Sequence, residues 1–287
     1  MDRKRHLLWI QPWMKLSFST DIPLGQLVDP TTLPAVQQIY PPIHDHADVN
    51  PVDCFHSDER PAAPDRPWVL VNMVSSIDGS IAVDGRAGGL SGPADRRLYQ
   101  VLRGLADVVL VGAGTVRAES YRAPRDPEKR VAQLREHRGQ APRPRLAVIS
   151  GDLNLDPKIG MFVEHDPSDP LPLVYTTTGA DPERRAVIKK VAEVVDLGAT
   201  QWCPEAMSAD LLARGANVVL CEGGPTINAQ LLAKGLIDEY CLTISPRVIG
   251  GSGGVGVTGQ APGAPVEFRL ARVLTEEGFL FCRYLVI

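Results

Sequence analysis

Two short apolar runs, each followed by glycines and then by a helix-compatible segment, constrain this chain most. Residues 108–111 lead into the sequence GAGT, and residues 218–221 lead into EGGPT. Each junction has the pattern of a buried strand, a tight turn and the start of a helix. Such a turn presents unpaired backbone N–H groups and a positive dipole end, which together suit a phosphate. Two such junctions predict a phosphate-bearing ligand at one edge of a sheet.

Composition places the chain among ordinary globular proteins. It has 287 residues, a formal net charge of −4 and 44% hydrophobic residues, enough for one large α/β domain or two small ones. No basic block stands out, which argues against nucleic acid and membrane surfaces as partners. No apolar run approaches the roughly 18 residues that span a bilayer. The first residues lack a signal-peptide core, so we expect a cytoplasmic protein, and five scattered cysteines are expected to be reduced.

Residues 1–65 differ in composition from the rest of the chain. Prolines recur throughout them, and no long periodic segment is present. We predict an irregular, proline-rich N-terminal arm that packs on the domain or on a neighbouring subunit, with one short helix over residues 33–40. His44 and His46 lie among aspartates without a third firm ligand, so we predict a solvated loop and no metal site. One domain is predicted over residues 66–287.

From residue 68 onward, short apolar runs alternate with segments of helical periodicity. Strands are predicted over residues 69–74, around 80–83, and over 107–111, 146–150, 173–176, 192–197, 218–221 and 240–245, and helices over 93–105, 182–191, 206–215 and 225–234. Residues 119–144 are polar and interrupted by prolines, and we predict a long surface excursion there. Residues 266–274 and 279–287 are predicted to pair as antiparallel strands. The alternation predicts an α/β fold with a mixed, mostly parallel sheet and helices on both faces.

Neither glycine turn matches a common nucleotide-binding signature. A dinucleotide-binding fingerprint would need glycine at Arg117, and a P-loop would need Gly-Lys-Ser/Thr after four residues. Each turn could therefore be an ordinary strand-to-helix connection. Thr115 adds a hydroxyl that could bond either the helix N–H groups or a bound phosphate. Glu222 ends a strand where open α/β sheets bind ligands, and its alternative role is to stabilise the helix dipole.

Four short motifs in series are similar to the reductase domain of riboflavin biosynthesis. They are SSIDGSIA at residues 75–82, Leu-Arg at 102–103 before Ala-Asp at 106–107, GAGTV at 112–116 and EGGP at 222–225. The resemblance covers about residues 68–287 and implies the dihydrofolate-reductase-like fold of that family. The chain is also similar to a stand-alone actinobacterial subgroup, for which folate reduction is a further candidate activity. The zinc deaminase signature of the bifunctional form is absent upstream of residue 68, so no deaminase activity is expected.

The resemblance implies an NADPH site along the C-terminal edge of the strands. The implied cofactor-binding residues are Asn72, Ser76 and Ser91 at the nicotinamide end, Gly112, Gly114, Thr115, Gly223, Gly224, Pro225 and Thr226 at the phosphates, and Ser150 near the adenosine 2′-phosphate. Asp78 and Glu222 would face the substrate as catalytic residues, and either of them, or a water, could supply a proton. Arg103 and Arg125 would bind a substrate phosphate, because a guanidinium matches phosphate oxygens. Such reductases are commonly dimers, so a homodimer is expected.

Three functions are open. The leading hypothesis is NADPH-dependent reduction of 5-amino-6-(5-phosphoribosylamino)uracil, in which hydride passes from nicotinamide C4 to C1 of the ring-opened imine. The second is reduction of dihydrofolate or another pterin, with Asp78 on the ring and Arg103 or Arg125 on the glutamate tail. The third is an NADPH-binding module without turnover. Ser80, where the family often has lysine, and Tyr99, where it commonly has histidine, put the substrate in doubt.

Overall fold

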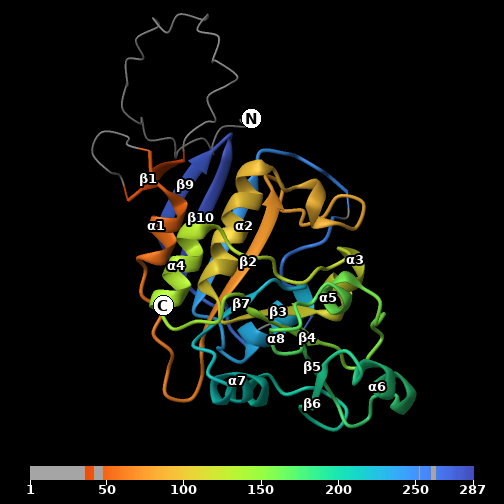
Figure 1. Ribbon diagram of the computed structural model, residues 1–287. Coiled ribbons are helices and arrows are strands. Elements are labelled where there is room, and N and C mark those ends of the chain that lie inside the picture. The colour runs from red at the N-terminus through yellow and green to blue at the C-terminus, as the bar shows by residue number, and fades with distance from the viewer. Residues whose placement is uncertain (1–35, 42–47, 252, 260–262) are drawn as a thin grey trace, which may run out of the picture. The chain divides into compact units, whose positions relative to one another are not determined.

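Ten strands of the described chain form one sheet, in the order β1-β9-β10-β8-β2-β7-β3-β4-β5-β6 (Figure 1). This computed structural model describes residues 36–41, 48–251, 253–259 and 263–287. The strands are β1 Gln37–Tyr40, β2 Trp68–Ser76, β3 Val108–Gly112, β4 Arg145–Ile149, β5 Leu173–Thr176, β6 Glu193–Asp196, β7 Val218–Cys221, β8 Glu239–Ser245, β9 Phe268–Glu276 and β10 Phe279–Val286.

The sheet is mixed and mostly parallel. Seven strands, β8-β2-β7-β3-β4-β5-β6, run parallel to one another. β10 pairs antiparallel with both β8 and β9, and β1 pairs antiparallel with the outer edge of β9. Every residue of β3 is buried, as expected for a central parallel strand that helices cover on both faces. The predicted fold class and the closing antiparallel pair are confirmed.

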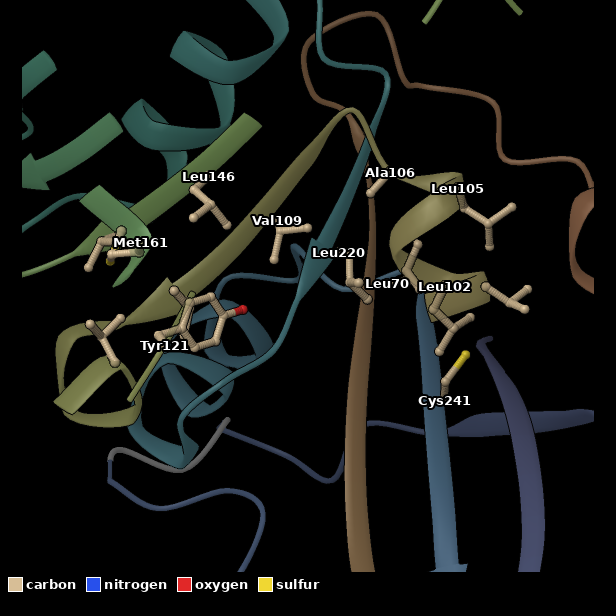
Figure 2. Packing of buried hydrophobic residues seen from close by; sticks show 14 of the residues in the cluster. Leu70, Leu102, Leu105, Ala106, Val109, Tyr121, Leu146, Met161, Leu220 and Cys241 are labelled. Carbon is tan, nitrogen blue, oxygen red and sulfur yellow. The ribbon is translucent and has the colours of Figure 1, made fainter. Parts of the chain in front are cut away.

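Helices cover the sheet on both faces. Their buried side chains belong to two separate apolar clusters. α1, α2, α4 and α5 contribute to one cluster, and α7 and α8 to the other. Figure 2 shows the first, where Leu102 of α2 lies among Leu70 and Leu220 from neighbouring strands. The helices are α1 Pro51–His56, α2 Pro93–Leu105, α3 Ala113–Ala118, α4 Lys129–His137, α5 Gly160–Val163, α6 Pro182–Ile188, α7 Pro204–Ala213 and α8 Pro225–Ala233. No helix among the described residues is long and apolar enough to cross a membrane.

Proline at the first helical position explains why several helix starts are predictable from the sequence. α1, α2, α6, α7 and α8 all begin with it, where its fixed φ suits the helix and its missing N–H group removes no helical hydrogen bond. α2 was predicted with the bounds that the structure shows. All five cysteines are free thiols, as expected.

Two predictions of local structure are wrong, and a third is incomplete. The described part of 33–40 forms strand β1 rather than a helix, because it pairs with the free edge of β9. Residues 80–83 form an irregular loop with one isolated bridge to Arg86. The segment predicted as a surface excursion over 119–144 contains the helix α4. Arg135 of α4 is buried, and its guanidinium donates to the carbonyl oxygens of Gly104 and Ala106 at the end of α2.

Part of the predicted N-terminal arm belongs to the domain. Val52 and Phe55 of α1 are buried in the same apolar cluster as the side chains of α2. Arg60 forms a salt bridge with the buried Glu239 of β8. His44 and His46, the residues considered as metal ligands, lie outside the described residues. Residues 48–65 therefore pack on the sheet and on α2.

His56, the last residue of α1, is buried beside arginines. Arg138 donates a hydrogen bond to His56 Nδ1 at 2.9 Å and another to its carbonyl oxygen at 2.6 Å. Burial, followed by the charges of Arg138 and Arg60, lowers the pKa of His56 from 6.5 to about 4. The imidazole is therefore neutral in the folded protein at neutral pH.

We expect the free energy of unfolding to fall by about 2 kcal/mol between pH 7.5 and pH 5 because of His56. In that interval the unfolded chain binds a proton at this residue and the folded chain does not, so stability decreases as pH falls. Urea unfolding of the native chain and of His56→Gln at both pH values measures the effect. The variant should be less sensitive to this pH change, and an equal loss in both proteins would assign the effect to another group.

Candidate active site

A cleft of about 1130 Å³ lies along the edge at which the parallel strands end. The residues that follow β3, β4 and β7 form its floor, and α2 and the loop before it form one side. Its lining includes Gly112 at the end of β3 with Ala113, Gly114 and Thr115 after it, Ile149 at the end of β4 with Ser150, Gly151 and Asp152 after it, Glu222, Gly224, Pro225, Thr226 and Ile227 after β7, and Asp95, Arg96, Tyr99 and Arg103 from α2.

The two glycine turns meet in this cleft, because β3 and β7 are neighbours in the sheet. Gly112 N–H donates to the Gly223 carbonyl oxygen at 2.7 Å. A Cβ atom added at Gly224 would lie 2.9 Å from Thr115 Oγ1, and one at Gly112 would lie 2.7 Å from Ile227 Cδ1. A side chain at Gly224 would therefore crowd the Thr115 hydroxyl, and one at Gly112 would require the end of the Ile227 side chain to move. The peptide bond between Gly223 and Gly224 is cis.

Glu222 forms the centre of a polar cluster at the end of β7. Arg103 Nε donates to its Oε1 at 2.7 Å and Arg103 Nη2 to its Oε2 at 2.9 Å, so the pair is bidentate. Tyr99 donates its hydroxyl to the same carboxylate at 2.9 Å, and Tyr121 also donates to it. The guanidinium carbon lies 4.4 Å from the Tyr99 ring centre and 5.2 Å from that of Tyr121. Helix α2 and the loop after α3 therefore bring three side chains together around the one negative charge of Glu222.

This cluster keeps its tyrosines neutral and its arginine charged. Burial and then the Glu222 carboxylate raise the pKa of Tyr99, and the same two causes raise that of Tyr121. Burial alone would lower the pKa of Arg103, but the adjacent Glu222 carboxylate raises it well above its usual value. Four donated hydrogen bonds leave the Glu222 carboxylate fully engaged by the chain's own side chains.

The cleft collects most of the residues predicted for the site. Those that line it are Asn72, Ser91, Gly112, Gly114, Thr115, Ser150, Gly224, Pro225, Thr226, Arg103 and Glu222. Ser76, Asp78, Gly223 and Arg125 are not among its lining residues. Gly223 forms the backbone of the turn instead, with a positive φ of 77° that favours glycine.

Asp78 connects two loops rather than facing the cleft. The Ser76 hydroxyl donates to its carboxylate, as do the backbone N–H groups of Gly250 at 2.7 Å and Ile249 at 3.2 Å. The Ser76 hydrogen bond, followed by the one from Gly250, lowers the pKa of Asp78 to about 2. These bonds hold the turn after β2 to the loop after β8, and they also occupy the Ser76 hydroxyl. The roles of Ser76 at the nicotinamide and of Asp78 at the substrate stay predictions.

Arg103 and Arg125, both predicted to bind a substrate phosphate, lie in different surroundings. Arg103 lines the cleft, but Glu222 neutralises it. Arg125 is exposed in the segment between α3 and α4, outside the cleft. The phosphate-binding role of both arginines stays a prediction.

Sequence reasoning missed several lining residues. Tyr121, Arg96, Arg122 and Trp202 all line the cleft. The spacing of Arg96 with Tyr99 and Arg103 on one helix face offered a signal for the first. Tyr121 and Trp202 come from loops, and no local pattern points to them.

Comparison with known proteins agrees with this geometry. The model of the RibD C-terminal domain matches residues 67–277. The 2,5-diamino-6-ribosylamino-4(3H)-pyrimidinone 5′-phosphate reductase of Methanothermobacter thermautotrophicus is 28% identical over 218 residues, which cover 74% of this chain and 95% of that protein. The reductase of the same name from Archaeoglobus fulgidus is 32% identical over 192 residues, covering 65% of this chain and 83% of that one.

A solved structure shares the fold across nearly its whole length. A pyrimidine reductase-like protein from Corynebacterium diphtheriae superposes with a TM-score of 0.72 at 28% identity, covering 83% of this chain and 99% of that one. The matched region of the family model includes both glycine turns, the whole of α2 and Glu222. The chain therefore belongs to the RibD C-terminal domain family.

Proposed function

We propose that this protein is an NADPH-dependent reductase of a pyrimidine that carries a ribosylamino 5′-phosphate, a step of riboflavin biosynthesis. The observation that carries the proposal is the meeting of two glycine turns in one cleft, in a chain whose relatives are named as reductases of such a pyrimidine. Those names favour the 2,5-diaminopyrimidinone as substrate. 5-Amino-6-(5-phosphoribosylamino)uracil differs from it at ring position 2 and is compared in the same assay.

The nicotinamide cofactor that this reductase family implies fits the cleft. A Cβ atom at Gly114 would meet no protein atom within 4 Å, so this lining glycine faces open space next to Thr115. The backbone of Gly224 lies so close to Thr115 that a Cβ atom there would come within 2.9 Å of the Thr115 hydroxyl oxygen. We assign the phosphates to the two turns, the nicotinamide end to Asn72 and Ser91, and the 2′-phosphate of NADPH to Ser150. When bound, the cofactor supplies the hydride.

The chain's own residues then position the substrate and exclude water. Tyr99 and Tyr121 carry their protons at neutral pH and are oriented by Glu222, which lies at the end of β7. Glu222 receives four hydrogen bonds from the protein, so we assign it a positioning role through Arg103 and the tyrosines. Holding the hydride donor and acceptor together in a fixed geometry is the main contribution expected of the protein.

Oxidation of NADPH by the purified protein tests the proposal. The two phosphoribosylamino-pyrimidines and dihydrofolate are offered in parallel. Turnover with a pyrimidine supports the proposal, and turnover with dihydrofolate alone supports the pterin alternative. NADPH binding without oxidation of any substrate supports a non-catalytic module. Absence of an NADPH-binding signal in a fluorescence titration contradicts the whole assignment.

Gly114→Ala is expected to weaken NADPH binding by about 10- to 100-fold, because the new methyl group would enter the space at the turn and separate the phosphate from backbone N–H groups. The fold should be unaffected, since this Cβ meets no protein atom within 4 Å. Fluorescence titration measures Kd, and urea unfolding confirms stability. Gly263→Ala is the control, because a Cβ atom at Gly263 would also have no protein atom within 4 Å and this residue does not line the cleft. Equal affinity of the two variants would place the cofactor elsewhere.

A further inference from the structure

A row of four polar side chains, spaced four residues apart, lines one side of the cleft. Ser91 lies just before α2, and Asp95, Tyr99 and Arg103 follow it along the helix, where residues four apart are neighbours. Tyr99 and Arg103 both donate to Glu222. Asp95, in the first turn of α2, does not belong to that cluster. Its role in the cleft is therefore a separate question.

Asp95 is a nearly buried carboxylate with one partner. The residue is 9% exposed, and among the described residues its side chain accepts a hydrogen bond from the Ser91 hydroxyl alone, at 2.5 Å to Oδ2. The nearby arginines have other acidic partners, since Arg97 pairs with Glu276 and Arg103 with Glu222. Burying a carboxylate is costly unless other groups donate to it. A ligand in the cleft that offers N–H donors would satisfy Asp95.

The hydrogen bond between these two residues determines what the pair can recognise. Ser91 has a single hydroxyl proton and donates it to Asp95, so both side chains present only acceptors to the cleft. Because Ser91 is assigned to the nicotinamide end, Asp95 lies next to the ring that donates the hydride. The acceptor carbon belongs to the sugar that is bonded to the amino group of the pyrimidine, so the pyrimidine must also lie near this end.

The two candidate pyrimidines differ along one edge of the ring. The 2,5-diamino-4(3H)-pyrimidinone has an N–H at position 3 and an amino group at position 2, which are two parallel donors like those of a guanidinium. In the uracil the same N–H lies between two carbonyl oxygens. A carboxylate accepts both donors of the first ring, but it accepts only one from the second and then places its other oxygen against a carbonyl oxygen.

We infer that Asp95 binds this edge of the pyrimidine and is the residue that selects a 2-amino ring over a 2-oxo ring. This inference rests on the proposed function. Ser91 orients the carboxylate of Asp95 through its hydroxyl. The specificity therefore comes from a pair of acceptors at the start of α2, separate from the cluster around Glu222.

The experiment compares kcat/KM for the two phosphorylated pyrimidines in the native chain and in Asp95→Asn. The native value should be about 10- to 100-fold higher for the 2-amino ring. Asparagine has nearly the same size but presents one acceptor and one donor, which match the N–H and the carbonyl of the uracil, so the preference should be reversed. Thermal unfolding checks that the variant is folded.

The alternative role of Asp95 is to stabilise the dipole of α2. That role predicts that Asp95→Asn changes both kcat/KM values by the same factor, and this result overturns the inference. Ser91→Ala leaves the carboxylate in place without its orienting hydroxyl, and it should reduce the native preference without reversing it. This second variant keeps the inference testable if Asp95→Asn does not fold, because an unchanged preference in Ser91→Ala contradicts it.

Asp152→Asn is the matched control. Asp152 is another carboxylate that lines the cleft, but it follows β4 at a distance from α2 in the sheet. Its substitution should change both kcat/KM values alike and leave the preference for the 2-amino ring intact. Loss of the preference in this variant would show that the negative charge of the cleft as a whole, and not Asp95, selects the substrate.

Calorimetric binding of the two ribitylamino products, one with a 2-amino and one with a 2-oxo ring, separates this inference from the proposed function. Tighter binding of the 2-amino product that is lost in Asp95→Asn supports the inference even if no NADPH is oxidised. Equal binding of both products by the native chain overturns it. Absence of turnover together with selective binding overturns only the proposed reductase activity.

Discussion

Replacing Arg103 by methionine is expected to lower the free energy of unfolding by about 3–5 kcal/mol, because the Glu222 carboxylate then stays buried without its counter-charge. The two side chains are only 11% and 6% exposed, and the guanidinium donates to both carboxylate oxygens. Methionine can replace much of the apolar stem of the arginine. Most of the loss therefore reports the missing charge, and urea unfolding measures it.

The double variant Arg103→Met with Glu222→Gln is expected to regain most of this stability, since no uncompensated charge remains. Its kcat should still be lower than that of the native chain by about 100-fold, because Tyr99 and Tyr121 lose the charged acceptor that orients them. A double variant as unstable as Arg103→Met alone would show that packing, and not charge, holds this cluster together.

Arg130→Met is the matched control for the ion pair. Arg130 pairs with Asp53 at the surface, where both side chains are more than half exposed. Solvent and salt screen such a pair, so its loss is expected to cost at most about 1 kcal/mol. If Arg130→Met lowered the free energy of unfolding as much as Arg103→Met does, the measurement would not distinguish a buried ion pair from an exposed one.

The local features of the fold could be predicted from the sequence. The conformation of both glycine turns and of the helix over residues 93–105 is determined by residues a few positions away in the sequence. The structure shows all three elements. Strand β1 and helix α4 could not be predicted in the same way. The first exists because the edge of β9 is free, and the second because Arg135 finds buried carbonyl oxygens in another segment.

The candidate site shows the same division. The glycines and Thr115 lie where the two turns predict, because adjacent parallel strands bring their ends together. The partners of Glu222 come from α2 and from the loop after α3, and both lie more than a hundred residues before Glu222 in the sequence. The family resemblance implies that Asp78 faces the substrate, and the N–H groups that engage its carboxylate lie more than a hundred residues further along the chain. Motifs indicate residue types, and tertiary contacts decide their roles.

Replacing Glu239 by glutamine is expected to lower the free energy of unfolding by about 3 kcal/mol, because two buried arginines then lose the nearer of the two carboxylates they share and keep only the more distant Asp58. Glu239 is fully buried, and it accepts hydrogen bonds from Arg60 at 2.9 Å and from Arg283 at 2.8 and 3.2 Å. Since Arg60 precedes β2 and Arg283 lies on β10, the carboxylate joins the N-terminal segment to the sheet. Amide exchange over residues 48–65 should become faster in the variant.

The pH dependence of Glu239→Gln separates charge from packing. Burial alone would raise the pKa of Glu239, but Arg60 and Arg283 lower it from 4.5 to about 2. Its stabilising contribution is therefore complete above pH 4.5 and lost as pH falls toward 2, so the variant should lose less stability over that interval than the native chain. Glu267→Gln, at an exposed glutamate, should change stability by no more than about 0.5 kcal/mol. Equal acid sensitivity of the native chain and Glu239→Gln would assign the stabilisation to packing, since removing the titrating carboxylate would then have changed nothing.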